Sequence, residues 1–280
     1  MLSHCLGIDH VVINTRDRID DAVDAYARLG FRLTSRGHHD SGSVNHLMMF
    51  GPDYLELIGV PPEHAGRRPE LSGSACGLNA IAFATDSAAG AHAALSHARF
   101  EPLAPVALSR PVATADGVRE ARFELVRLPS TLIDWGRLFV CEHLTRDLVW
   151  RDGMRSHPNS VREITRVVVT VPDPSADAAR LAPLFAEASM RPGAARAELS
   201  IGHSRIDLVT PEALNRRYGD FATAANGRTS FMAALELRCA SLDAARIALR
   251  ALPARDVHDQ GNRLIVAARR GFETTLEFIE

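Results

Sequence analysis

A histidine and a glutamate lie in two strongly apolar stretches whose residues alternate with the period of a β-strand. His10 shares one strand face with Val12 and Asn14, and Glu56 shares another with Ile58. A buried carboxylate needs a partner, because an unpaired charge inside a protein is costly. The partner could be a divalent metal bound together with His10, or one of the many arginines of the chain. The pair therefore predicts either a metal site or an ion pair beside a hydrogen-bonded core histidine.

The composition narrows the class of partner. The chain has 280 residues, of which 46% are apolar, so a large buried core is expected. Its 32 basic and 34 acidic residues nearly cancel, which leaves no basic field for nucleic acid and no polybasic anchor for a membrane. No lysine occurs, which excludes lysine Schiff-base chemistry and a phosphate-binding P-loop. A small molecule is the expected partner, with no nucleic acid and no membrane.

The cysteines and the N-terminal segment favour a cytoplasmic protein. The four cysteines are scattered without a C-x-x-C pair, which argues against a zinc knuckle or a disulfide framework. The first residues lack the charged and apolar regions of a secretory leader, and no apolar stretch is long enough to span a membrane. Neither a nucleotide-binding G-x-G-x-x-G after a strand nor a G-x-S-x-G nucleophile motif is present. We therefore expect no nucleotide cofactor and no triad hydrolase.

A weak internal repeat runs through the chain. The first copy predicts a strand at 8–15, a helix at 17–29 and three further strands, ending at 54–60. The same order starts again near Leu78, Ile164 and Phe231. We therefore predict an α+β protein of four β-α-β-β-β modules.

Long connectors separate parts of these modules. Four stretches are expected to be connectors without regular structure, and loops of this length are usually lids, binding loops or linkers: 61–77, 102–117, 145–161 and 211–229. The third divides the modules two and two, into a domain at 1–150 and a second at 160–280. Because one module cannot cover both faces of its own sheet, modules must pair, and a paired sheet leaves a cup suited to a ligand.

Three segments of the first module are distinctive: 7–13 (GIDHVVI), 45–50 (NHLMMF) and 53–59 (DYLELIG). They resemble the vicinal oxygen chelate superfamily of glyoxalases, extradiol dioxygenases and bleomycin-resistance proteins, and in particular its glyoxalase-like branch. The resemblance implies two glyoxalase/dioxygenase-like domains with mixed curved sheets. It also implies metal ligands on the first and last strands of paired modules, for Zn, Ni, Co, Mn or Fe.

The resemblance assigns roles to several residues of the first domain. His10, Glu56 and Glu142 are the implied metal ligands, and a displaced carboxylate, Glu56 or Glu142, is the implied general base. His46 is a further candidate, either as ligand or as substrate contact. Ala80 stands where an extradiol dioxygenase places its second histidine, which disfavours that reaction.

The remaining expectations concern the substrate and the second domain. Substrate contacts are expected from His46, Met48 and Tyr54 in the first module and from Trp150 and His157 near the connector, although each could instead be a packing residue. In the second domain, Arg166 is expected to pair with Asp207, which predicts a structural role or an anion-binding cup.

Three functions fit these residues. The first is a glyoxalase-like, metal-dependent lyase or isomerase that acts on a small oxygenated metabolite in the cup of the first domain. The alternative is a metal-free small-molecule binding or sequestration protein of the same fold. An extradiol-type dioxygenase is the third. A homodimer is left open, because modules can pair within a chain or between chains.

Overall fold

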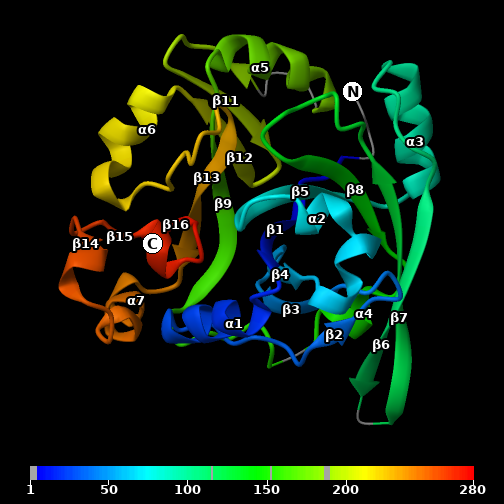
Figure 1. Ribbon diagram of the computed structural model, residues 1–280, viewed down its shortest axis with the longest axis horizontal. Helices are drawn as coiled ribbons and strands as arrows, with labels where there is room; N and C mark the ends of the chain where they lie inside the picture. The colour runs from blue at the N-terminus through cyan, green and yellow to red at the C-terminus, as the bar shows by residue number, and fades with distance from the viewer. Residues whose placement is uncertain (1–4, 115, 152, 186–189) are drawn as a thin grey trace.

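The four modules fold into two eight-stranded mixed sheets, as predicted from the repeat (Figure 1). The computed structural model describes residues 5–114, 116–151, 153–185 and 190–280. The first sheet contains β1 (Ile8–Arg16), β2 (Gly37–His38), β3 (Val44–Met49), β4 (Tyr54–Gly59), β5 (Gly77–Thr85), β6 (Val106–Thr114), β7 (Gly117–Arg127) and β8 (Arg137–His143). Its helices are α1 (Ile19–Arg28), η1 (Pro62–Arg67), α2 (Pro69–Ser72), α3 (Ala88–His97) and α4 (Arg146–Val149).

The second sheet repeats this order. Its strands are β9 (Val161–Thr170), β10 (Met190–Arg191), β11 (Arg196–Ile201), β12 (Ser204–Val209), β13 (Phe231–Cys239), β14 (Val257–Asp259), β15 (Arg263–Val266) and β16 (Thr275–Ile279). The helical segments are α5 (Pro174–Leu181), η2 (Ala182–Leu184), α6 (Pro211–Tyr218), η3 (Gly219–Phe221), α7 (Leu242–Leu249), η4 (Ala254–Asp256) and η5 (Ala268–Arg270). None of the described helices is long and apolar enough to cross a membrane.

Each sheet is built around one antiparallel pair of central strands. The order β2-β3-β4-β1-β5-β8-β7-β6 pairs the first strands of the two modules, β1 and β5, and each of these pairs in parallel with the last strand of its own module. The edge strands β2 and β6 lie in contact, so the first sheet curls nearly into a barrel. The second sheet has the corresponding order, β10-β11-β12-β9-β13-β16-β15-β14.

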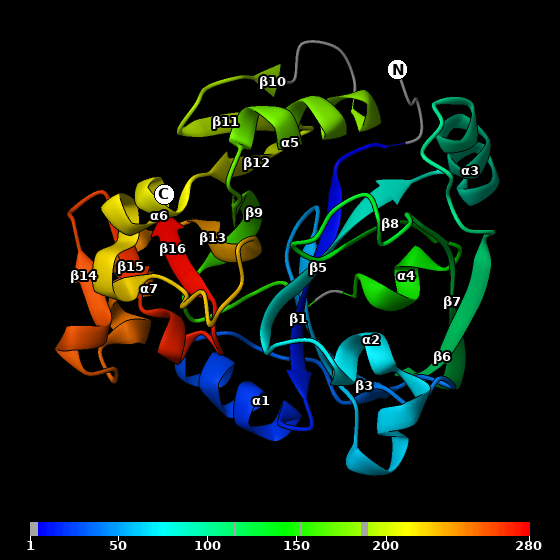
Figure 2. The same ribbon diagram turned by 45° about the horizontal axis from the view of Figure 1, so that its top comes forward.

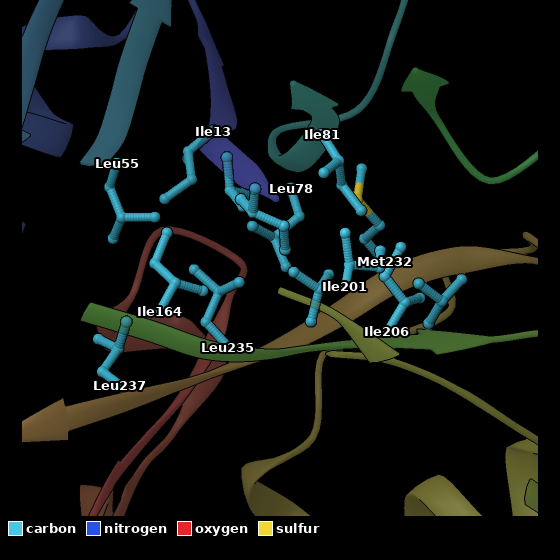
Figure 3. Close-up of a cluster of buried hydrophobic side chains, with 14 of the residues drawn as sticks. Ile13, Leu55, Leu78, Ile81, Ile164, Ile201, Ile206, Met232, Leu235 and Leu237 are labelled. Atoms are coloured by element: carbon cyan, nitrogen blue, oxygen red, sulfur yellow. The ribbon is translucent and has the colours of Figure 1, made fainter. Parts of the chain in front are cut away.

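The two sheets pack against each other through apolar faces. Figure 3 shows Ile13, Leu55, Leu78 and Ile81 of the first sheet facing Ile164, Ile201, Ile206, Met232, Leu235 and Leu237 of the second. These side chains are at most 6% exposed, and burial of each aliphatic side chain contributes about 1.5–3 kcal/mol. Strand alternation then turns His10 and Val12 to the opposite face of β1, away from the second sheet.

The stretch 102–117 differs from the expected connector, because most of it forms the edge strand β6. This strand pairs with β7 in a long hairpin, which lies on the side of the first sheet far from the second domain (Figure 2). Pro111 interrupts the sequence pattern of a strand, but an edge strand tolerates proline because its outer N–H groups need no partner. The stretch 211–229 likewise begins with a helix, α6.

A buried carboxylate joins the two domains. Asp53, in the turn between β3 and β4, is fully buried, and its carboxylate accepts hydrogen bonds from the Ile164 backbone N–H at 3.1 Å and from His203 Nε2 at 2.9 Å. Burial raises the pKa of Asp53 to about 6, although both hydrogen bonds act in the opposite direction. The hydrogen bond to Asp53 raises the pKa of His203.

These two groups make the stability of the chain depend on pH. An Asp53 pKa of about 6, above its ordinary 3.8, means that the folded state binds the proton more tightly than the unfolded state. Its contribution is fully present below the ordinary value and is lost as pH rises through 6, and the raised pKa of His203 acts in the same direction. The free energy of unfolding of the wild type should therefore fall between acid and neutral pH. In Asp53→Asn this fall should be smaller than in the wild type by on the order of 3 kcal/mol. Urea denaturation of wild type, Asp53→Asn and the exposed control Asp24→Asn checks this, and equal pH slopes in all three would contradict it.

Candidate functional site

A cavity of about 560 Å³ lies in the concave face of the first sheet. Most of its wall is apolar, and a few polar side chains converge on it, which is the usual character of a small-molecule site. The lining residues from the sheet include His10, Val12, Asn45, Leu47, Tyr54, Glu56, Ile58, Leu108, Arg110, Phe123, Leu125, Arg137, Phe139 and Cys141.

His10 and Glu56 meet in this cavity. The parallel pairing of β1 with β4 places Val12 opposite Glu56 and His10 opposite Tyr54, so the side chains share the concave face. His10 Nε2 lies 3.8 Å from Glu56 Oε2, and Glu56 Oε1 accepts a hydrogen bond of 2.7 Å from Asn45 Nδ2. The partner of the buried carboxylate is thus an amide and an imidazole.

A β-bulge adds a second carboxylate to His10. The register of β1 against β5 shifts between Ile8 and His10, which makes Asp9 an extra residue in the strand. Asp9 Oδ2 lies 2.6 Å from His10 Nδ1 and 3.0 Å from His143 Nε2. Strict alternation would place Asp9 on the face opposite His10, so sequence reasoning missed it. The only sequence signal was an aspartate next to a histidine in an apolar strand.

The buried Asp9 carboxylate is ionised. Burial alone would raise the pKa of Asp9, but the hydrogen bonds from His10 and His143 outweigh burial and hold the pKa well below its usual range. Because an ionised carboxylate only accepts hydrogen bonds, His10 donates through Nδ1. In the neutral imidazole, Nε2 is then free to accept a proton on the cavity side.

Aromatic rings hold this histidine pair in place. The Tyr54 ring stacks on His10 with centroids 4.4 Å apart, and it lines the cavity. Trp150 packs edge-on against Tyr54 at 5.4 Å and His143 at 4.9 Å, with the Arg146 guanidinium over its ring. Trp150 therefore backs the site rather than lining it.

The register expected for Glu142 is wrong. In the central pair, Val12 lies opposite Ala80 and His10 lies opposite Ala82, so the twofold relation between the modules makes Ala80 the counterpart of His10 and Ala82 the counterpart of Val12. Val12 lies opposite Glu56 on β4, and Ala82 lies opposite Phe139 on β8, so Phe139 is the counterpart of Glu56. Glu142 points away from the cup, and its Oε2 accepts a hydrogen bond of 2.7 Å from the backbone N–H of Ala88, where α3 begins. It stabilises a helix N-terminus and is not brought to His10.

His46 and Met48 also lie outside the cup. Asn45 and Leu47 occupy the cavity face of β3, so His46 and Met48, which alternate with them, point to the opposite face of the sheet. His46 Nδ1 donates to the Thr34 carbonyl at 2.8 Å, and Met48 is fully buried in the core. Neither side chain is therefore placed to contact a ligand bound in this cavity.

His157, in the connector before β9, packs against segments of the first domain and does not line the cavity. Its Nδ1 accepts a hydrogen bond from the Arg32 backbone N–H at 3.0 Å, and its Nε2 donates to the Met49 carbonyl at 2.8 Å. Its ring packs edge-on against Phe31 and Phe50. Both ring nitrogens are thus used to hold chain segments together.

The donors present do not fit the metal site implied by the first and last strands. Those four positions hold His10, Glu56, Ala80 and Phe139, so they supply two donors where a protein-bound metal usually takes three or four. No reaction step is therefore assigned to a metal at this position.

Another group of residues could hold a metal ion. Within the described residues, ligand atoms of Asp9, Cys141 and His143 all lie within 4.8 Å of one another. The small side chains of Ala82 and Ala84 on β5, the strand between β1 and β8, leave room for these groups to meet. Cys141 also lines the cavity.

The corresponding face of the second sheet is filled by ion pairs. Arg166 contacts Glu236 and lies 3.3 Å from Asp207, the pair predicted from the sequence. From α6, Arg217 and Tyr218 bond the Glu277 carboxylate at 2.8 and 3.0 Å, and Tyr218 packs with other apolar side chains over the sheet. These interactions support a structural role for this face.

Comparison with known proteins identifies the fold and a family match. A family model described as a glyoxalase-like domain matches residues 8–185. No curated protein matches the chain. A hypothetical protein from Staphylococcus aureus superposes with a TM-score of 0.64 at 14% identity, over 97% of each chain.

Two dioxygenase structures share the same architecture. A xylose isomerase-like TIM barrel/4-hydroxyphenylpyruvate dioxygenase fusion protein gives a TM-score of 0.58 at 14% identity, over 99% of this chain and 49% of that one. An extradiol ring-cleaving dioxygenase from B. fuscum gives 0.53 at 13% identity, over 99% and 72% of the two chains. At these identities the likeness shows the fold.

The position of Glu142 leads to a stability prediction. Glu142→Ala should lower the free energy of unfolding by about 1 kcal/mol, because the first backbone N–H of α3 loses a charged acceptor. Ligand binding in the cavity should stay unchanged. Urea denaturation alongside the exposed control Glu120→Ala measures the first effect, and fluorescence titration with the dye 8-anilinonaphthalene-1-sulfonate measures the second. Loss of dye binding without loss of stability would show that Glu142 belongs to the binding site after all.

Proposed function

Because the chain belongs to the glyoxalase-like domain family of the vicinal oxygen chelate superfamily, we propose that the cup of its first domain binds a small oxygenated molecule and that His10 moves a proton on that molecule, as an isomerase or lyase requires. One observation carries the proposal: a histidine held through Nδ1 by a buried, ionised aspartate presents Nε2 to a cavity large enough for an organic ligand.

Each neighbour of His10 has a distinct part in this proposal. Asp9 fixes the tautomer and orientation of the imidazole and stabilises its positive charge after it accepts a proton. Tyr54 holds the ring by stacking, and Glu56, 3.8 Å from Nε2, is placed to receive or return the proton. The apolar walls exclude water, which strengthens these electrostatic interactions.

A metal-dependent form of this function is not supported at the implied ligand positions, because they supply too few donors. Among the residues that the structure describes, Asp9, Cys141 and His143 form the one group of three donors that could hold a divalent metal, and their mixed oxygen, sulfur and nitrogen set suits Zn²⁺ or Co²⁺. Such a metal would act as a Lewis acid near the cavity. The proton transfer proposed for His10 needs only residues of the chain.

Ala80 and Phe139 favour a second candidate, a metal-free binding protein. They replace the counterparts of His10 and Glu56 with apolar groups, which gives the cup one reactive side and one inert side. Such a protein would sequester the ligand and leave it chemically unchanged, so an assay of proton exchange separates the two candidates.

Proton transfer can be tested without knowing the natural substrate. Hydroxyacetone, dihydroxyacetone and phenylpyruvate are incubated with the protein in D₂O, and loss of the proton signal next to the carbonyl is followed by NMR. We expect enzyme-dependent exchange on at least one compound, a fall of roughly 10²-fold or more in His10→Gln, and a smaller fall in Asp9→Asn. Chelator treatment should leave the exchange in place. Exchange at the same rate in His10→Gln would contradict the proposed role of His10 in proton transfer. Ligand binding without exchange would support the second candidate, the metal-free binding protein.

Metal binding has its own test. Cobalt(II) added to metal-free protein should give a thiolate-to-cobalt absorption band, because Cys141 is the one sulfur donor of the group. The band should disappear in Cys141→Ser and remain in Cys239→Ser, in which another buried cysteine is changed. A band that survives Cys141→Ser would place the metal elsewhere, and no band in wild type would remove it from this group.

A further inference from the structure

We propose that the molecule bound in the cup of the first domain is an anion with an apolar body, and that the Arg110 guanidinium holds its carboxylate-type head group. The inference rests on the proposed function only in that it uses the same cup. It does not depend on the proton transfer assigned to His10.

Arg110 is a buried cation without a partner in the protein. Its side chain lines the cavity and the residue is 9% exposed, yet it forms no hydrogen bond or ion pair with any residue that the structure describes. None of its nitrogens is sealed off from solvent, so its unused donors open onto the cavity, where only solvent or a ligand can accept from them. Other buried arginines have acceptors within the protein: Arg137 donates to Asn79 Oδ1 at 2.8 Å, and the terminal nitrogens of Arg166 pair with two carboxylates. The free donors of Arg110 therefore call for an acceptor from a ligand.

The fold keeps the guanidinium in this place. Arg110 pairs across the β6–β7 hairpin with Ala121, whose small side chain leaves room beside it. On the other side, the edge strand β2 closes against β6 with a glycine: a Cβ on Gly37 would lie 3.2 Å from Arg110 Nη1. Because the sheet nearly closes here, the guanidinium lies between Ala121 and Gly37 and extends into the cup.

The charges around the cavity also favour an anion. Five guanidinium groups line the cavity against two carboxylates, and those carboxylates are already engaged. Arg68 holds Glu70 at 2.6 Å, and Glu56 is bonded to Asn45. The five arginines are Arg67, Arg68, Arg110, Arg127 and Arg137. A planar guanidinium fork matches a carboxylate geometrically, and such charge-assisted pairs are among the stronger hydrogen bonds.

The rest of the cavity specifies the body of the ligand. Leu47, Leu108, Phe123 and Phe139 present apolar surface around the polar groups. An organic acid with an aromatic or branched apolar part would bury that part here while its head group meets Arg110. The same orientation places the ligand in the cavity shared by His10 and Glu56.

A competing role for Arg110 is purely structural. Arg110 could neutralise Glu56 through space, in which case its replacement would lower stability and weaken every ligand alike. Arg110 as a ligand-binding residue affects anions selectively. The two roles therefore differ in a readout that stability alone does not supply.

A matched pair of dyes tests the inference on the full chain. 8-Anilinonaphthalene-1-sulfonate and N-phenyl-1-naphthylamine share one ring system and differ by the anionic group. Fluorescence titration at physiological ionic strength should show tighter binding of the anionic dye to wild type. Arg110→Gln should weaken the anionic dye roughly tenfold or more and leave the neutral dye within about twofold. The control Arg122→Gln, on the same hairpin but outside the cavity lining, should change neither.

Further measurements keep each outcome decisive. Leu108→Trp should reduce binding of both dyes, whereas Val118→Trp, at an exposed position of the same hairpin, should not. In wild type, 1-naphthoate should displace the anionic dye at lower concentration than its neutral amide, a comparison that needs no variant to fold. Equal affinities for anionic and neutral compounds, or an unchanged Arg110→Gln, would overturn the anion assignment while the cup remains a binding site. Failure of both dyes to bind, or no effect of Leu108→Trp, would overturn the cup itself.

Discussion

The antiparallel pairing of β1 with β5 is the constraint on which the rest of the structure depends. It joins two modules that could not each bury a sheet face alone, and it makes one continuous curved sheet with an apolar and a concave side. The apolar side is covered by the second domain, and the concave side is left to enclose the cavity as a cup. The same pairing contains the bulge that brings Asp9 next to His10, and the bulge recurs at Thr165 in the second sheet. Architecture and site therefore have one origin.

The two domains use the same geometry for opposite purposes. In the second sheet the concave face carries Arg166, Glu236 and Glu277, which form ion pairs with one another and with Arg217 of α6. In the first sheet the concave face keeps a cavity, and its polar groups are satisfied only in part, since Arg110 has no partner among the described residues. A closed network of charges stabilises a fold, whereas an open one leaves donors for a ligand. This contrast is the reason for proposing the first domain, rather than the second, as the ligand-binding domain.

The family resemblance predicts the fold of this chain well, but it predicts the residues of the site only in part. Of the four strand positions that the superfamily uses for a metal, only the first module keeps polar groups, His10 and Glu56, while Ala80 and Phe139 occupy the second. His10 has a buried aspartate, Asp9, as its partner. The function proposed for the cup therefore rests on these side chains and not on the fold, because function depends on the site rather than on the scaffold.

The sequence by itself determined the module order, the need for pairing and which neighbours share a strand face with His10 and with Glu56, because strand and helix periodicities are local properties of the chain. The meeting of His10 with Glu56 was expected only from the family resemblance, and the β1–β4 pairing brings it about. Only the tertiary structure decided the register of β8, which puts Phe139 rather than Glu142 in the cup, and the bulge at Asp9. It also turned an expected connector into the strand that carries Arg110. Register, bulges and edge pairing depend on strands distant in sequence, so no local pattern specifies them.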